Sequence, residues 1–274
     1  MTEGVLLPTH SAAARRRRVY GVVLRDLYSL RHNPPRLLEI VFWPTLELIV
    51  WGYVSVYLQA RQVPVVVATL LGGVLLWQVL YRSQGELSIA FLEDMWSRNL
   101  LNVFVTPLST VEYLAGQVLF GALKTAAGAV LMASLALGLY GFGVLTIGPA
   151  LVPFMAILLV MGWALGVLAI ATVVRFGASA QVIAWILSFI FQPFAAVFYP
   201  LSILPGPVQA IAKAVPASYV FENMRAVLNG QSPSWSGLAV AAALDVGYVV
   251  AALLFFRYAL RHARVRGRLS RFGD

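Results

Sequence analysis

Six stretches of the chain are long and apolar enough to cross a membrane as helices. A spanning helix needs about 20 mostly apolar residues, because the backbone can satisfy its hydrogen bonds in the hydrocarbon core only within the segment. The pattern therefore predicts an all-α polytopic membrane protein with both ends on one side. The expected spans are residues 37–58, 64–81, 112–138, 150–173, 179–199 and 238–258.

Lys and Arg are distributed unevenly around these spans, and positively charged flanks stay on the cytoplasmic side of a membrane. Sixteen of the 20 Lys and Arg residues fall on the side of the two termini, whereas only Arg61, Lys213 and Arg225 fall on the other side. We therefore expect both termini to be cytoplasmic. The expected divisions are a cytoplasmic N-terminal arm (1–35), a transmembrane domain (36–260) and a basic cytoplasmic tail (261–274).

The segment before the first span is amphipathic. Apolar residues recur at helical spacing between positions 19 and 30, whereas Arg18, Arg25 and His32 fall on the opposite face. This pattern predicts a helix that lies in the membrane interface, with a solvated basic arm as the alternative. The proline pair at 34 and 35 is expected to end the helix and turn the chain into the membrane.

Composition supports the membrane interpretation and excludes several kinds of chemistry. Hydrophobic residues make up 60% and charged residues 11% of the chain, compared with roughly 25% charged residues in soluble domains. The net charge of +9 comes from basic blocks beside apolar segments, which favours anionic membrane lipids over nucleic acid as the partner. The absence of cysteine excludes disulfides, thiolate metal sites and Cys nucleophiles.

Known catalytic motifs are also missing. The three histidines lie in flanking segments, and neither HExxH nor GxSxG occurs. Gly116, Gly121 and Lys124 come nearest to a phosphate-binding loop, but Ala122 stands where that loop requires Lys. We expect no catalytic residue, metal or cofactor in this chain.

The expected cytoplasmic loop at 82–111 is the most charged internal stretch, and it continues into RNLLNVFVTPLS. Trp96 and Phe104 share one helical face, Asn99 and Asn102 share another, and Pro107 stops the helix. A short amphipathic helix of this kind either docks into a groove on a partner or rests on lipid. Periodicity leaves both interpretations open.

The expected outer segment at 199–237 holds five prolines among apolar residues. It is too short to span the membrane twice and too apolar for a free loop, which favours a re-entrant or lid-like hairpin packed on protein. Its second half, 218–229, has a helical pattern that ends at Asn229-Gly230. Glu222 and Arg225 stand one helical turn apart on it.

Three ionisable residues fall inside the expected spans: Glu47, Lys124 and Asp245. A lone charge in mid-bilayer costs at least ~2.5 to 3.5 kcal/mol. Because Glu47 and Lys124 both lie near the middle of their spans, we expect them to pair. Such a pair is either structural or part of a proton relay or substrate contact.

Three segments give the chain a family resemblance that covers most of residues 15–260. The segments are RHNPPRLLEIVFWP, RNLLNVFVTPLSTVEYLAG and YPLSILPGPVQAIAKAVPASYVFENMRAVLNG. In these segments the chain resembles the membrane subunits of ABC-2 type exporters, whose ATPase is a separate chain.

The resemblance implies particular roles for residues in two of these segments. The RNLLNVFVTPLS helix would be the coupling helix that fits a groove on the ATPase, and the outer segment would match the re-entrant helices of the family. The implied coupling residues are Trp96, Arg98, Asn99, Leu101, Asn102 and Phe104. The implied outer motif is Pro216, Tyr219, Glu222 and Arg225.

The resemblance also implies partners, cofactors and a location. It implies a homodimer in a bacterial inner membrane, with two copies of an ATP-binding subunit that holds ATP and Mg. The substrate would be an amphipathic or lipid-linked glycan, lipid or drug. The many aromatic residues of the spans suit either a sugar-stacking channel or interfacial belts.

Two other classes of function compete with this interpretation. A proton-coupled secondary transporter would use Glu47, Lys124 and Asp245 and would need no ATPase, but it often shows an inverted repeat, and we find none. A membrane-embedded lipid-processing enzyme would need acid, base or metal ligands clustered at one depth. The three scattered charges do not favour it.

Overall fold

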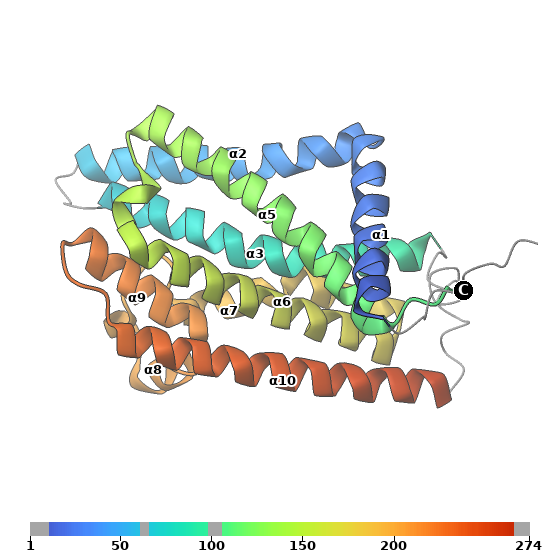
Figure 1. Cartoon of the computed structure of the whole chain (residues 1–274). Helices are drawn as coiled ribbons and strands as arrows, with labels where there is room; N and C mark the ends of the chain where they lie inside the picture. The colour runs from blue at the N-terminus through green and yellow to red at the C-terminus, as the bar shows by residue number, and fades with distance from the viewer. Residues whose placement is uncertain (1–10, 61–65, 98–105, 266–274) are drawn as a thin grey trace, which may run out of the picture.

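The computed structural model describes residues 11–60, 66–97 and 106–265 (Figure 1). Within these ranges the chain is almost entirely helical and contains no strand. The helices are α1 (Ala12–Arg31), α2 (Pro34–Ala60), α3 (Val66–Trp96), α5 (Thr110–Tyr140), α6 (Leu151–Phe176), α7 (Gln181–Ala195), α8 (Gly206–Ala212), α9 (Pro216–Leu228) and α10 (Trp235–Val265). Short 3-10 helices occupy Val144–Ala150 (η1), Ala178–Ala180 (η2) and Leu201–Ile203 (η3).

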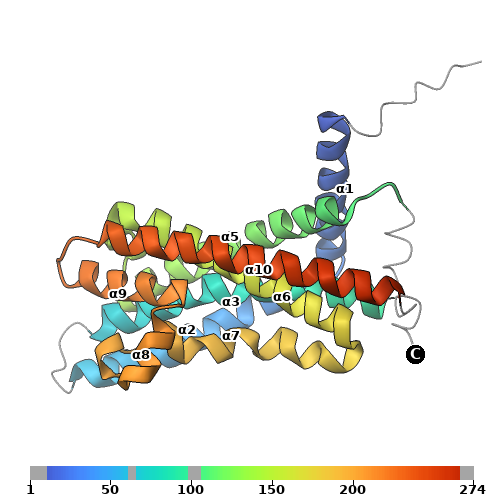
Figure 2. The same ribbon diagram turned by 90° about the horizontal axis from the view of Figure 1, so that it is seen from below.

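The long helices form a bundle with α3 and α6 at its centre. α2 and α5 pack on α3, α10 packs chiefly on α6, and α7 contacts both central helices. α1 stands crosswise at one end of the bundle, where α3 and α10 end and α5 begins (Figures 1 and 2). We call this the α1 end. α8 and α9 lie at the opposite end, which we call the α9 end.

The predicted all-α membrane fold is confirmed, and each expected span contains a helix. Four segments are long and apolar enough to cross a membrane: α2, α5, Val144–Phe176 and Trp235–Ala263. α7 is apolar but has only 15 residues. α3 has 31 residues and carries charged side chains in its second half. The number of spans stays a prediction.

The expected start of a loop at residue 82 is wrong. α3 continues without interruption to Trp96, so the first half of the expected loop at 82–111 is helix. Arg82, Glu86 and Glu93 remain in the bundle because each is paired with a charged side chain of opposite sign. Pairing removes much of the cost that charge imposes on a buried helix.

α1 is the amphipathic helix that the sequence predicts. The Ser11 side chain caps its N-terminus by accepting from the backbone N–H of Ala14 at 3.1 Å. Val22 and Val23 are buried in the protein, where α1 packs on α5. Gly116 makes this contact possible, because a Cβ there would lie 2.6 Å from the Cβ of Val22. The interfacial position of α1 in the membrane stays a prediction.

The two central helices approach each other closely. A Cβ at Gly162 of α6 would lie 1.8 Å from Ser83 Oγ and 2.7 Å from the carbonyl oxygen of Leu80, both on α3. No larger side chain fits at this crossing without movement of the α3 backbone. The crossing therefore fixes α3, whose other faces carry the polar groups described below.

A buried polar network attaches the short helix α7 to α3. The Gln84 side chain donates to Ser88 Oγ at 2.9 Å and to the carbonyl oxygen of Ala184 at 2.8 Å, and Ser188 Oγ donates to Gln84 Oε1 at 2.6 Å. Gln84, Ser88 and Ser188 are at most 1% exposed. Satisfied hydrogen bonds of this kind specify one packing of the two helices.

Candidate functional site

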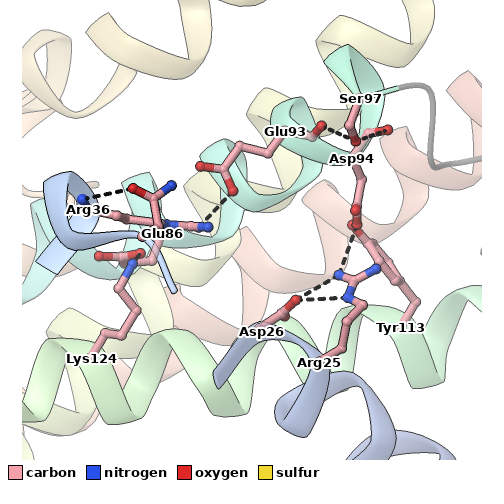
Figure 3. Close-up of polar contacts among 10 residues, drawn as sticks. Arg25, Asp26, Arg36, Glu86, Glu93, Asp94, Ser97, Tyr113 and Lys124 are labelled. Atoms are coloured by element: carbon pink, nitrogen blue, oxygen red, sulfur yellow. Dashed lines mark hydrogen bonds and ion pairs between the residues drawn. The ribbon is translucent and has the colours of Figure 1, made fainter. Parts of the chain in front are cut away.

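Polar residues form a line along one side of α3. Gln78, Arg82, Glu86 and Glu93 recur at intervals of four or seven residues, which places them on one helical face, and Asp94 follows Glu93 at the edge of that face. We call these five residues the polar ladder. Its side chains contact α1, α2 and α5 (Figure 3).

At the α1 end, the ladder holds the crosswise helix in place. Arg25 of α1 contacts Asp94 Oδ2 at 3.0 Å and Asp26 Oδ1 at 2.8 Å, and the Tyr113 hydroxyl donates to the same Asp94 oxygen at 2.7 Å (Figure 3). Burial raises the pKa of the Asp26 carboxyl, although the positive charge of Arg25 acts in the opposite direction. These contacts connect α1 to both α3 and α5.

A second ion pair joins α1 directly to α5. Arg18 Nη2 lies 2.6 Å from Glu112 Oε1, and the guanidinium donates to both carboxylate oxygens. Glu112 also forms a capping box with Ser109 at the start of α5. A bidentate pair of this geometry is stronger than an ordinary surface salt bridge.

The middle of the ladder connects α2 and α5 to α3. Arg36 of α2 lies 2.7 Å from Glu93, and Lys124 of α5 forms an ion pair with Glu86 (Figure 3). Arg82 lies 3.8 Å from Glu86 and donates to the carbonyl oxygen of Ile40 at 2.7 Å. Glu86 therefore lies between two cations.

The expected pair of Glu47 and Lys124 is not formed. Glu47 accepts a hydrogen bond from Gln78, and Lys124 is paired with Glu86. The expectation failed because it placed residues 82–96 in a loop, outside the set of charges that face Lys124. The i, i+4 spacing of residues 78, 82 and 86 is the sequence signal that would have revealed their common face.

Two cavities lie along the ladder and share the side chains of Arg36, Glu86 and Glu93. One, of about 620 Å³, is enclosed by α1, the start of α2, the end of α3 and α5. We call it the α1 cavity. The other, of about 720 Å³, lies between α2, α3 and α7, with Lys124 of α5 in its wall. We call it the α2 cavity.

The α2 cavity has both aromatic and charged walls. Tyr81 and Phe189 face each other there with ring centroids 5.2 Å apart. The other aromatic lining residues are Trp43, Trp51 and Trp185, and the charged or amide lining residues are Arg36, Glu39, Glu47, Gln78, Arg82, Glu86, Glu93 and Lys124. Trp77, another aromatic of the spans, has a packing role, because it is 1% exposed in the core. The cavity thus suits a ligand that has polar and apolar parts.

Asp245 does not belong to this site. It lies on α10, is 3% exposed and lines neither cavity. Its Oδ1 atom has no hydrogen-bond partner among the described residues. Of the three ionisable residues singled out in the spans, Glu47 and Lys124 therefore line the α2 cavity, whereas Asp245 is buried elsewhere on α10.

The implied outer motif holds η3, α8 and α9 together, and we call these three elements the hairpin at the α9 end. Glu222 accepts from the backbone N–H of Leu201 at 2.8 Å and pairs with Arg225 at 2.7 Å, while Arg225 donates to the carbonyl oxygen of Ala196 at 2.8 Å. Tyr219 donates to the carbonyl oxygen of Lys213 at 2.9 Å, and Pro216 begins α9. The predicted helix in this segment is confirmed as α9, which ends at Leu228.

The implied coupling residues are mostly beyond structural description. Arg98, Asn99, Leu101, Asn102 and Phe104 lie outside the described residues. Trp96, near the end of α3, is 51% exposed. Its indole N–H donates to Gln181 Oε1 at the start of α7, at 3.2 Å. Among the described residues, no group of three or more His, Asp or Glu side chains is arranged to hold a metal ion.

These features define a multi-pass membrane protein with an amphipathic cavity in its helical bundle. The family model of the ABC-2 type transporter matches residues 22–229, from within α1 through α9. The chain therefore belongs to the ABC-2 type transporter family, as the resemblance of three of its segments implied. It is a permease component. A comparison with curated proteins finds no match.

Breaking the Glu86–Lys124 pair is expected to destabilise the protein, because Lys124 would keep a buried charge without its partner. We expect Glu86→Gln to lower the free energy of unfolding in mixed micelles by about 3 kcal/mol. In a double-mutant cycle, Glu86→Gln and Lys124→Met should cost clearly less together than the sum of the two single changes.

Glu47→Gln supplies the matched control for this cycle. It changes another carboxyl in the same cavity, and we expect its effect to add to that of Lys124→Met without coupling. Strong coupling of Lys124 to Glu47, with none to Glu86, would contradict the pairing described here.

Proposed function

We propose that this chain is the permease subunit of an exporter in a bacterial inner membrane, driven by ATP hydrolysis on a separate nucleotide-binding subunit. The α2 cavity would form part of the pathway for an amphipathic or lipid-linked substrate. The observation that carries this proposal is the joint presence of aromatic and charged walls in one cavity of a membrane bundle. ATP and Mg would be held by the partner subunit.

The walls of the α2 cavity favour a substrate with two chemical parts. Trp43 and Trp185 offer flat apolar surfaces on which a sugar ring or an acyl chain can pack. Glu47, Arg82 and Lys124 offer charge and hydrogen bonds to a polar group. A purely apolar substrate would leave these polar groups without new partners, which is unfavourable.

Exposure of α2 supports a pair of permease copies. Only 17% of the most apolar 18-residue stretch of α2 is buried, close to the 22% of α10 and far below the 72% of Val144–Phe176. Unlike α10, α2 lines the α2 cavity. The exposed side of α2 borders the cavity, and Trp43 and Val50 belong both to that side and to the cavity lining. We propose that a second copy covers this side and closes the pathway in a homodimer. Two ATP-binding subunits would bind this homodimer on its cytoplasmic side.

The continuity of α3 supports a mechanical route from the ATPase to the cavity. The implied coupling residues follow α3 directly, and α3 runs as one helix to the cavity wall at Arg82 and Gln78. Trp96 also contacts Gln181 at the start of α7, which carries Trp185 in the same cavity. A displacement at the coupling segment would therefore reach two walls of the pathway.

The hairpin at the α9 end suits a lid over the outer mouth of the pathway. Its buried residues, such as Val220 and Phe221, pack inside the protein. Ile211 of α8 is 52% exposed in the single chain. We propose that the membrane or the second copy covers this residue, because a re-entrant segment presents apolar side chains to such surroundings.

Dependence on a separate ATPase is the direct test of the proposed function. We expect the chain purified alone to hydrolyse no ATP, and the complex isolated from its native cells to contain an ATPase subunit. Phe104→Ala should reduce ATPase recovery and ATP-driven transport, because residue 104 belongs to the implied coupling helix. Val111→Ala, which changes an apolar residue that is 73% exposed at the start of α5, is the control.

Two outcomes would contradict the proposal. ATP hydrolysis by the isolated chain would show that the ATPase site belongs to this chain and not to a separate subunit. Transport that continues without ATP and stops when the proton gradient is dissipated would favour the proton-coupled alternative, in which Glu47, Lys124 and Asp245 carry protons.

Cysteine labelling tests the lid, since the native chain has no cysteine. We expect Ile211→Cys to react slowly with a membrane-impermeant thiol reagent in intact membranes and quickly after transfer to detergent as a monomer. Ser232→Cys, in the exposed link between α9 and α10, should react quickly in both. Fast labelling of Ile211→Cys in membranes would indicate an ordinary surface loop.

A further inference from the structure

The α1 cavity has a more polar lining than the α2 cavity of the proposed pathway. Phe120 and Trp96 are its aromatic lining residues, and charged or amide side chains make up most of the rest. α1 forms one wall through Arg25, Asp26 and Ser29. The cavity is therefore a polar space covered by the crosswise helix.

Two lining side chains have hydrogen-bonding atoms without partners. Gln117 is 2% exposed, and its amide nitrogen has no hydrogen-bond partner among the described residues. Asp26 holds Arg25 with Oδ1, while its buried Oδ2 has no partner within the described part of the chain. Buried polar atoms are normally satisfied, so an unused donor and an unused acceptor in one cavity indicate a ligand.

The charges of the cavity define what that ligand carries. Four carboxylates line the cavity, on Asp26, Glu86, Glu93 and Asp94, against the guanidinium groups of Arg25 and Arg36. Glu86, Glu93 and Asp94 are already paired with Lys124, Arg36 and Arg25, whereas Asp26 shares Arg25 with Asp94. A cation is therefore favoured at Asp26, whose Oδ2 requires an N–H or O–H donor. The Gln117 amide requires an oxygen acceptor. A ligand with an ammonium group close to an ester or phosphate oxygen satisfies both.

The position of the cavity identifies the source of such a ligand. α1 exposes Tyr20, Leu27 and Tyr28, each more than half exposed, on a helix that lies across the end of the bundle. Two of them lie between the lining residues Asp26 and Ser29 in the sequence. A crosswise amphipathic helix with exposed aromatic and apolar side chains is typical of the headgroup region of a membrane.

We propose that the α1 cavity binds the headgroup of an aminophospholipid from the leaflet that surrounds α1. The ammonium group donates to Asp26, and a phosphate oxygen accepts from Gln117. The bound lipid would rest against Trp96, the first of the implied coupling residues. This assignment does not depend on the proposed substrate or on the ATPase partner, because it concerns lipid binding by the chain itself.

Native mass spectrometry of the purified chain tests the assignment with lipids that have identical acyl chains. We expect phosphatidylethanolamine to be retained about tenfold more strongly than phosphatidylcholine or phosphatidylglycerol, as a charge-assisted hydrogen bond requires. Phosphatidylcholine has no N–H donor for Asp26, and phosphatidylglycerol has no ammonium group. Equal retention of the three lipids would overturn the proposal.

Two variants separate the roles of the lining residues. Asp26→Asn should remove the preference for phosphatidylethanolamine, whereas Asp245→Asn should keep it, because Asp245 is a buried carboxyl outside the cavity. Gln117→Met should weaken phosphatidylethanolamine binding several-fold and preserve the preference over phosphatidylcholine. A preference that survives Asp26→Asn, or unchanged binding in Gln117→Met, would overturn the assignment.

A soluble headgroup distinguishes a lipid from a free metabolite. We expect O-phosphoethanolamine at millimolar concentration to leave the bound lipid in place, since it lacks the acyl chains that contact α1. If O-phosphoethanolamine binds as tightly as the lipid, the cavity serves a soluble ligand and the lipid assignment is wrong.

Discussion

The pairing of charges along α3 is the constraint on which the rest of the structure depends. A charged side chain in a membrane bundle is costly unless an opposite charge or a hydrogen bond compensates it. Lys124 pairs with Glu86, Arg36 with Glu93, and Arg25 with Asp94, so each of α5, α2 and α1 is attached to the same helix. Removal of the ladder would leave Lys124 with a buried, unpaired charge and would take from α1 and α2 their ionic contacts with α3.

The ladder also explains why the bundle contains cavities at this place. Small residues bring α3 and α6 into close contact at Gly162, which leaves the polar side of α3 to face α1, α2 and α5. Ionic side chains of α1, α2 and α5 meet the ladder there, and the space beside them forms the two cavities that share Arg36, Glu86 and Glu93. The same ion pairs that stabilise the bundle thus line the proposed pathway and the proposed lipid site.

Sequence reasoning predicted the helical elements better than the site. Apolar length identified a helix in every expected span, and the proline and glycine signals correctly indicated the α1–α2 turn and the end of α9 near Asn229. Charge density suggested a loop from residue 82, because hydropathy measures each residue alone and cannot show that Glu86 has a cation on another helix. The Gln117 and Asp26 atoms left without partners depend on tertiary contacts, so no sequence pattern indicates them.

In the proposed homodimer, the α2 cavity becomes a closed pathway only when a second copy covers α2. Disulfide cross-linking in native membranes tests it directly, with single cysteines at Trp43, Val50 and Tyr57 on the exposed side of α2. The account predicts covalent dimers from at least one of these positions and none from Val246→Cys or Leu254→Cys, which are equally exposed on α10. Dimers that form through α10 and not through α2 would contradict it.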